Sequence, residues 1–148
     1  MKKNLILFLT LSLLVLSVSC NCSNGSADCS VGISLQGNWT IRELPAATEK
    51  KIPPAPAANL KISFRKPDQT AEISGCAGDN RFFGQAVISN KKILFQQMGM
   101  TRMMGPNARF EDYFMKALNE TVSYIVRKDD VFFLNKDGKT VLILKKEK

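Results

Sequence analysis

Residues 106–120, PNARFEDYFMKALNE, constrain the fold more than any other segment, because their apolar side chains recur with helical spacing. The stripe follows positions i, i+3, i+4, i+7 and i+8 and consists of Phe110, Tyr113, Phe114, Ala117 and Leu118. Pro106 suits the first turn of a helix, where a missing N–H costs nothing. Acidic residues lie early in the segment and Lys116 lies later, as the helix dipole favours. The pattern predicts one main helix near residues 107–119.

Short strand patterns occupy much of the chain on both sides of this helix. Alternation of apolar and polar residues between turn signals predicts five strands before the helix and three after it. The expected strands cover residues 35–44, 60–64, 70–74, 85–89, 92–97, 121–127, 130–135 and 140–145. The strands at 85–89 and 92–97 are expected to form a hairpin that turns at Asn90 and Lys91. Short connections favour antiparallel neighbours, and one helix cannot cover both faces of so large a sheet. We therefore expect an α+β fold with about eight strands in a strongly curved, open-barrel-like antiparallel sheet, and the helix over one side or end.

The N-terminus, MKKNLILFLTLSLLVLSVSC, resembles a bacterial lipoprotein signal peptide. Lys2 and Lys3 form a basic region, and the apolar stretch after them is shorter than the roughly 20 residues that a spanning helix needs. Small residues then lead directly to Cys20, which the resemblance marks as the residue that is cleaved and acylated, with palmitate among the acyl chains. An ordinary secreted protein cut near the same point is the alternative.

This interpretation divides the chain into three parts. Residues 1–19 are the signal peptide, and residues 20–34, rich in Ser, Asn and Gly, are a flexible tether. Residues 35–146 form a single domain, which is long enough to bury a core without disulfides. The chain is therefore expected in the bacterial cell envelope, lipid-anchored in the outer membrane and facing the periplasm.

Four cysteines are present, and one of them is the expected lipid attachment site. If Cys20 carries lipid, three thiols remain in an oxidising compartment. Cys22 and Cys29 could form a local disulfide that leaves Cys76 unpaired, or either of them could pair with Cys76. The spacing leaves these alternatives open.

The scattered placement of the basic residues disfavours nucleic acid as a partner, although the chain is basic. The formal net charge is +8, and removing Lys2 and Lys3 with the signal peptide lowers it to +6. The basic residues are scattered, apart from a short run at the C-terminus. We expect a monomer whose contacts are the membrane, through its anchor, and an unknown envelope protein.

The segment SGCAGDNRFFG, residues 74–84, contains residue types that occur in reactive sites, but their pattern favours a structural role. The sequence holds no histidine, so Cys76 lacks the usual base of a nucleophilic thiol, although Arg81 nearby would favour a thiolate. The glycines match no phosphate-binding pattern, and no metal-ligand spacing is present. We expect no catalytic residue, no metal and no cofactor.

A structural account gives each residue of that loop a role. Asn80 can bond to nearby backbone groups, and Arg81 can bind carbonyl groups or Asp79. Phe82 and Phe83 point to opposite sides of the chain and are expected to anchor the corner to the core. Asn80 and Arg81 could alternatively form a binding surface.

The segment GMTRMMGP, residues 99–106, crowds methionines around Thr101 and Arg102. Methionines more often fill irregular core space than bind soft metals such as Cu(I). We expect Arg102 to lie buried beside the Arg81 loop, with Asp79 as its partner, because an unpaired buried charge is costly.

Three motifs together make the chain similar to the META domain, the HslJ-like heat-shock family. They are GNW at 37–39, SGCAGDNRFFG at 74–84 and GMTRMMGP at 99–106, in the family's order and directly before a helix. The resemblance covers residues 35–146 and implies a compact α+β domain in an envelope lipoprotein. Asp79 and Gly105 depart from it, since family members often carry cysteines at these two places.

The resemblance implies a non-enzymatic lipoprotein module linked to heat or antibiotic stress, which acts by protein binding or envelope support. The alternative is a lipocalin-like carrier with a small molecule in the mouth of the curved sheet, because Gly37-x-Trp39 is similar to the start of such barrels. A carrier would need an apolar cavity on the order of 300 Å³ or more.

Overall fold

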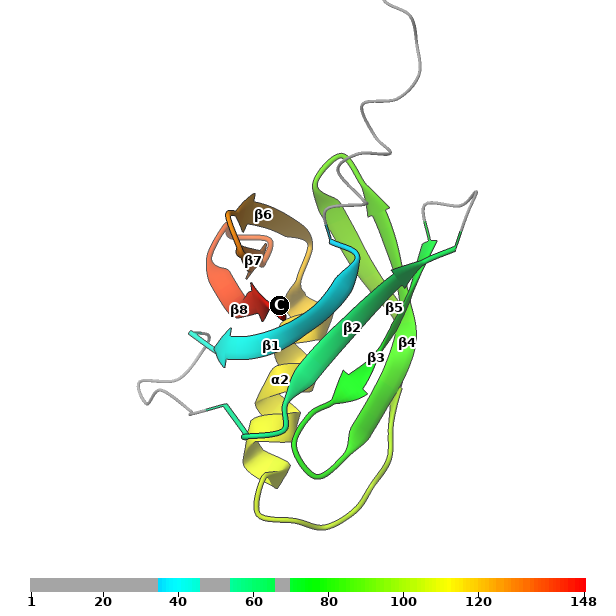
Figure 1. Ribbon diagram of the computed structural model, residues 1–148, viewed down its shortest axis with the longest axis vertical. Coiled ribbons are helices and arrows are strands. Elements are labelled where there is room, and N and C mark those ends of the chain that lie inside the picture. The colour runs from blue at the N-terminus through cyan, green and yellow to red at the C-terminus, as the bar shows by residue number, and fades with distance from the viewer. Residues whose placement is uncertain (1–34, 46–53, 66–69) are drawn as a thin grey trace, which may run out of the picture.

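The computed structural model describes residues 35–45, 54–65 and 70–148. The expected signal peptide, the tether, Cys20, Cys22 and Cys29 lie outside the described residues. The elements are β1 (Gly37–Glu43), β2 (Asn59–Phe64), β3 (Thr70–Cys76), β4 (Arg81–Ser89), β5 (Lys92–Met100), α2 (Ala108–Glu120), β6 (Ser123–Arg127), β7 (Asp130–Leu134) and β8 (Thr140–Lys146). Figure 1 shows strands β2–β5 on one side, strands β6–β8 on the other, and β1 between them.

The strands follow each other in space in the order of the sequence, and every neighbouring pair is antiparallel. Pairing of β1 with β8 closes the ring. The junction of β5 with β6 is weak, because the single pair Lys92↔Ser123 joins them. Within the described residues, the eight strands form one curved antiparallel sheet accompanied by one helix, which confirms the predicted fold class.

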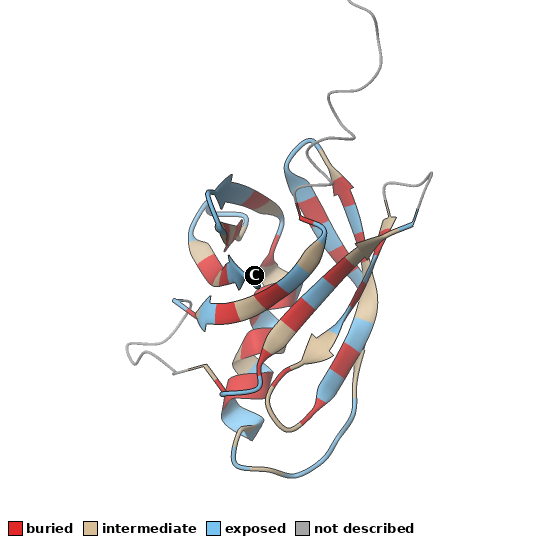
Figure 2. Cartoon of the chain, in the orientation of Figure 1, coloured by how far each residue is buried: buried red, intermediate tan, exposed pale blue. Residues whose placement is uncertain are grey.

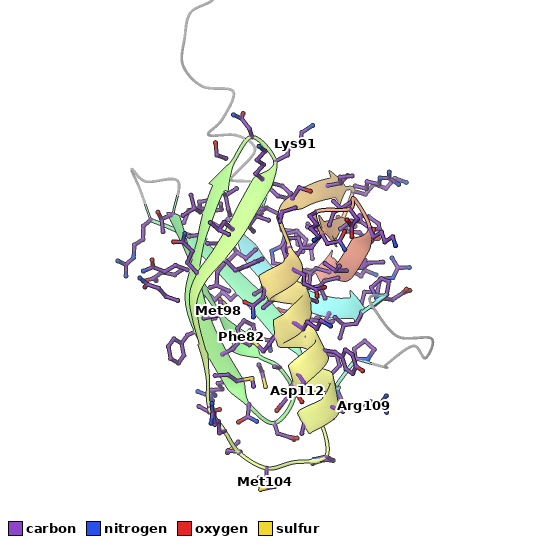
Figure 3. All side chains as sticks on the ribbon, turned by 180° about the vertical axis from the view of Figure 1, so that it is seen from behind. Phe82, Lys91, Met98, Met104, Arg109 and Asp112 are labelled. Atoms are coloured by element: carbon purple, nitrogen blue, oxygen red, sulfur yellow. The ribbon has the colours of Figure 1, made fainter. Side chains whose placement is uncertain are left out.

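Helix α2 lies where the ring is weakest, between β5 and strands β6–β8 (Figure 3). Its apolar stripe faces inward, as the helical spacing predicts, and Phe110, Phe114, Ala117 and Leu118 are all buried. The Phe114 ring meets the Phe82 ring of β4 edge-on, with 5.1 Å between ring centroids. The helix thus closes an interior that the strands alone would leave open.

The core is built from alternate residues of the strands, so buried and exposed bands alternate along most of them (Figure 2). The largest fully buried side chains include Trp39, Tyr124, Phe82, Phe114 and Phe133. Trp39 is the sole tryptophan, and its indole N–H donates a 2.9 Å hydrogen bond to the Leu35 carbonyl. Burial of these side chains is the main stabilising contribution to the ring.

Turn chemistry explains the β4–β5 hairpin, which projects at the upper end of the molecule in Figure 1. Asn90 and Lys91 have φ values of 48° and 63°, and Ser89 pairs with Lys92 on either side of them. Two central residues with positive φ match the right-handed twist of the flanking strands. This confirms the hairpin predicted at these two residues.

Among the described residues, no helix has the length and hydrophobicity needed to span a bilayer.

Candidate functional site

Asn80 lies at the centre of the motif region and is only 2% exposed. Its side-chain oxygen accepts the Met103 N–H at 2.6 Å and the Thr101 hydroxyl at 2.9 Å. Its side-chain nitrogen donates to the Met103 carbonyl at 2.9 Å. The amide therefore pairs with both backbone groups of Met103, as a neighbouring strand would, and fixes the loop of residues 101–107.

Glu111, in the first turn of α2, is the second buried polar residue of this region, at 3% exposure. One carboxylate oxygen accepts the backbone N–H groups of Asp79 and Asn80, both at 2.7 Å. The other oxygen accepts the side-chain N–H of Asn80 at 2.7 Å. Each contact brings an N–H donor to a carboxylate oxygen, which is the arrangement that a buried acidic group needs.

Asp79 attaches the same turn to the start of α2. Its carboxylate accepts the backbone N–H of Asn107 at 2.9 Å and the Asn107 side-chain N–H at 3.0 Å. Asn107 is the N-cap residue, and its own side chain makes no cap bond to the helix backbone. Asp79 thus supplies from outside the helix an acceptor for an N–H group at its N-terminus.

Gly105 lies directly against Asp79. A Cβ atom built on Gly105 would fall 2.1 Å from an Asp79 carboxylate oxygen and 2.9 Å from the Asp79 Cβ. No side chain fits there while Asp79 binds Asn107. The two places at which the resemblance implies cysteines are therefore adjacent in space. In this chain, hydrogen bonds that Asn107 donates to Asp79 link the β3–β4 turn to the start of α2 there.

We call Asp79, Asn80, Thr101, Asn107 and Glu111 the Asn80 network. It joins the β3–β4 turn, the 101–107 loop and the first turn of α2. Gly78, with φ of 127°, lets the β3–β4 turn place Asp79 and Asn80 side by side. Among the described residues, every buried side-chain nitrogen and oxygen has a hydrogen-bond partner.

Arg102 was predicted to be buried beside Asp79, and this prediction is wrong. Arg102 and Arg81 are both exposed, and Asp79 binds Asn107 instead. Arg81 contributes through its backbone: its N–H donates to the Thr101 hydroxyl at 3.0 Å, and its carbonyl accepts the Thr101 N–H at 2.9 Å. The physical reason is that the buried Asn80 and Glu111 already satisfy the loop, so no cation is needed inside.

The remaining motif residues divide between the core and the surface. Phe82 is 1% exposed and packs in the core as expected, whereas Phe83 is 60% exposed and does not anchor the corner. Cys76 ends β3 opposite Arg81, is half-buried, and its thiol donates to the Gly78 carbonyl at 3.0 Å. The segment predicted as a loop is mostly strand, because β3 and β4 extend into it and leave only residues 77–80 as a turn.

The methionines of the third motif also divide. Met98 and Met100 are partly buried and pack against the core, in agreement with a space-filling role. Met103 is 61% exposed and Met104 is fully exposed, and Figure 3 shows Met104 on the loop at the lower end of the molecule. Within the described part of the chain, no group of three or more acidic, histidine or cysteine residues could hold a metal ion.

Sequence reasoning did not identify Glu111 and Asn107 as members of the site. One signal was present for Glu111, because it precedes Phe114 by three residues and Leu118 by seven, which places a carboxylate on the apolar stripe. Asn107 carried no comparable signal.

A model of the META domain family matches residues 33–148, which confirms the resemblance seen in the three motifs. No curated protein matches the chain. The NMR structure of a protein from Burkholderia xenovorans matches 80% of this chain and 87% of its own, with 21% identity and a TM-score of 0.56. A second NMR structure matches 77% of this chain and 92% of its own, with 23% identity and a TM-score of 0.52. The crystal structure of a DUF4847 family protein from Bacteroides vulgatus matches 77% of this chain and 94% of its own, with 15% identity and a TM-score of 0.50. At these identities the structures support the fold alone.

Proposed function

Because the chain belongs to the META domain family, we propose that it is a non-enzymatic module of the bacterial envelope that acts by binding another envelope protein. In this proposal, the acylated Cys20 tethers it to the outer membrane on the periplasmic side. The binding supports the envelope under heat or antibiotic stress. The 101–107 loop forms the binding surface.

One observation carries this proposal: Asn80 holds both backbone groups of Met103, while the Met103 side chain points to solvent. A loop whose backbone is already ordered loses less conformational entropy when it binds. Loops positioned by a rigid scaffold are common binding sites, and exposed methionines are frequent at adaptable binding surfaces.

The proposal that the module is non-enzymatic is supported by the hydrogen bonds in which the polar motif residues are already engaged. Asp79, Asn80 and Glu111 direct their side chains at backbone groups or at each other, as a support for the loop would require. The chain contains no histidine for proton transfer near neutral pH.

No observation favours the small-molecule carrier. A carrier needs an apolar cavity inside the ring, and Trp39, Phe82 and Phe133 pack there with at most 1% exposure. The hollows among the described residues include one lined by Val87, Leu94 and Val122, which are exposed at the surface.

Site-specific photocrosslinking tests the binding function. With p-benzoylphenylalanine in place of Met104 in the full-length protein, irradiation of intact cells is expected to yield a discrete adduct with another protein. The same group in place of Lys136, an exposed residue between β7 and β8, is the control and is expected to yield little adduct. Adducts at position 136 and none at position 104 would contradict a binding role for the loop.

The tether gives a separate prediction. Cys20→Ala removes the expected acylation site and should move the protein from the membrane fraction to the soluble fraction, because buried acyl chains contribute about 0.8 kcal/mol per CH₂ to membrane binding. Fractionation followed by immunoblotting measures the change, with Cys22→Ala as the matched control. Retention of the Cys20→Ala protein in the membrane fraction would show that lipid on Cys20 is not what anchors it.

A further inference from the structure

We propose that the partner presents an acidic protein segment with an apolar side chain, and that this segment docks on a surface formed by Arg81, Arg102, Met103, Met104 and Arg109. We call this the arginine–methionine surface. The proposal rests on the proposed function, since it names the chemistry of the protein that the 101–107 loop binds.

Three elements bring the arginines around one loop. Arg81 begins β4 and is held next to Thr101 by the hydrogen bonds between them, so it lies beside Arg102 at the start of the loop. Arg109 follows the N-cap Asn107 by two residues, in the first turn of α2. All three side chains are exposed, although the Arg109 guanidinium lies 5.9 Å from the centre of the Tyr113 ring.

The acidic groups of this region are mostly turned inward. Asp79 accepts hydrogen bonds from Asn107, and the buried Glu111 accepts backbone N–H groups of the β3–β4 turn. Asp112, one turn into α2, is exposed. The arginine ion pairs found among the described residues belong to Arg42 and Arg65, so the arginines of this surface keep guanidinium groups available to a partner.

The apolar side chains lie between the cations along the chain. The Met103 side chain is 61% exposed, and the Met104 side chain is fully exposed. Hydrogen bonds from and to Asn80 fix the backbone of Met103. A flexible thioether accommodates varied apolar side chains, and a planar guanidinium pairs with carboxylates through two parallel hydrogen bonds. A segment with carboxylates flanking an apolar residue would complement both kinds of group.

The position of the surface favours a protein over the anchoring bilayer. Figure 1 shows the 101–107 loop at the lower end of the long axis, whereas β1 begins in the upper half, close to where the described chain starts at Leu35. A tether that joins the domain at Leu35 would leave this loop on the side remote from its attachment.

The test uses the full-length chain with p-benzoylphenylalanine in place of Met104, irradiated in isolated envelopes. In one version, Arg81, Arg102 and Arg109 are all changed to Gln. In the control, Lys61, Lys136 and Lys139 are changed to Gln, which removes the same charge from exposed positions elsewhere. Both triple variants are expected to melt like the parent, because all six side chains are exposed.

The adduct yield is expected to fall about tenfold in the arginine variant and to stay unchanged in the lysine variant, since each exposed ion pair contributes modestly. Higher ionic strength should reduce the yield of the parent toward that of the arginine variant. Mass spectrometry of the adduct should map the contact to a partner peptide with net negative charge.

Several outcomes would overturn the proposal. The adduct could form equally well in the arginine variant, or map to a neutral or basic peptide. Either result would show that the loop binds a protein but that the bound segment is not recognised through acidic groups. No adduct at position 104 in any version would reject the proposed function as well. Binding of the Cys20→Ala chain to phosphatidylglycerol vesicles that needs the three arginines, together with adducts to phospholipid alone, would identify the surface as a lipid contact instead.

Discussion

Replacing Asn80 with alanine is expected to lower the free energy of unfolding by about 3 kcal/mol, because it removes the partner of several polar groups at once. Both backbone groups of Met103 lose their hydrogen bonds, and a buried oxygen of Glu111 loses its donor. The Met103 backbone belongs to an exposed loop and can turn to water, so the expected loss comes mainly from Glu111 and from the small cavity left behind.

Urea denaturation followed by tryptophan fluorescence measures this loss, since the buried Trp39 is the sole tryptophan. Arg102→Ala is the matched control in the same loop region. It should change the free energy of unfolding by less than about 0.5 kcal/mol, because the side chain is exposed. Equal losses for the two variants would show that the loop is not held by Asn80.

Glu111→Ala is expected to lower the free energy of unfolding by about 3 kcal/mol, because it leaves buried N–H groups without acceptors. The backbone N–H groups of Asp79 and Asn80 and the side-chain N–H of Asn80 all donate to this carboxylate. Removal of a buried carboxylate also removes the cost of its own desolvation, which keeps the expected loss below the sum of the three bonds.

Hydrogen exchange gives this prediction a local readout. The amide protons of Asp79 and Asn80 should exchange faster in Glu111→Ala, by a larger factor than amides at the centre of the β7–β8 hairpin. Asp112→Ala, at the next position of α2, is the control and should leave both amides protected, since Asp112 is exposed. Unchanged protection in Glu111→Ala would mean that the carboxylate does not hold the turn.

The two substitutions should not be additive. Asn80 and Glu111 share a 2.7 Å hydrogen bond, so the double variant should lose less than the two single losses combined, by on the order of 1 kcal/mol. A fully additive pair would show that each residue acts alone and that the Asn80 network is not a unit.

The chain has no cysteine at residue 79 or residue 105, so no disulfide can join the β3–β4 turn to the 101–107 loop at these positions. Asp79 and Gly105 lie against each other, in the places where the resemblance implies cysteines. The carboxylate of Asp79 fills the space at Gly105 and links the β3–β4 turn to Asn107 by two hydrogen bonds. The connection between turn and helix is thus present, with noncovalent bonds in place of a covalent one.

Periodicity in the sequence predicted the kind and order of the described elements, although β3, β4 and β5 are longer than predicted. The stripe through Phe110 and Phe114 predicted α2, and alternation predicted the strands, because side-chain spacing reflects which face of each element is buried. Asn90 and Lys91 predicted the hairpin turn, since a short connection depends on residues adjacent in sequence. The motifs around Asn80 and Thr101 identified the family before any contact was known.

Only the tertiary structure decided which side chains form the site. Glu111 and Asn107 meet the β3–β4 turn from 31 and 28 residues away, and Met103 meets Asn80 from 23 residues away. Whether a carboxylate is buried against N–H donors, or an arginine faces solvent, depends on how three separate elements converge. The spacing of residues along the sequence does not indicate which distant elements meet in space. For this reason Arg102 was expected to be buried and Glu111 was not.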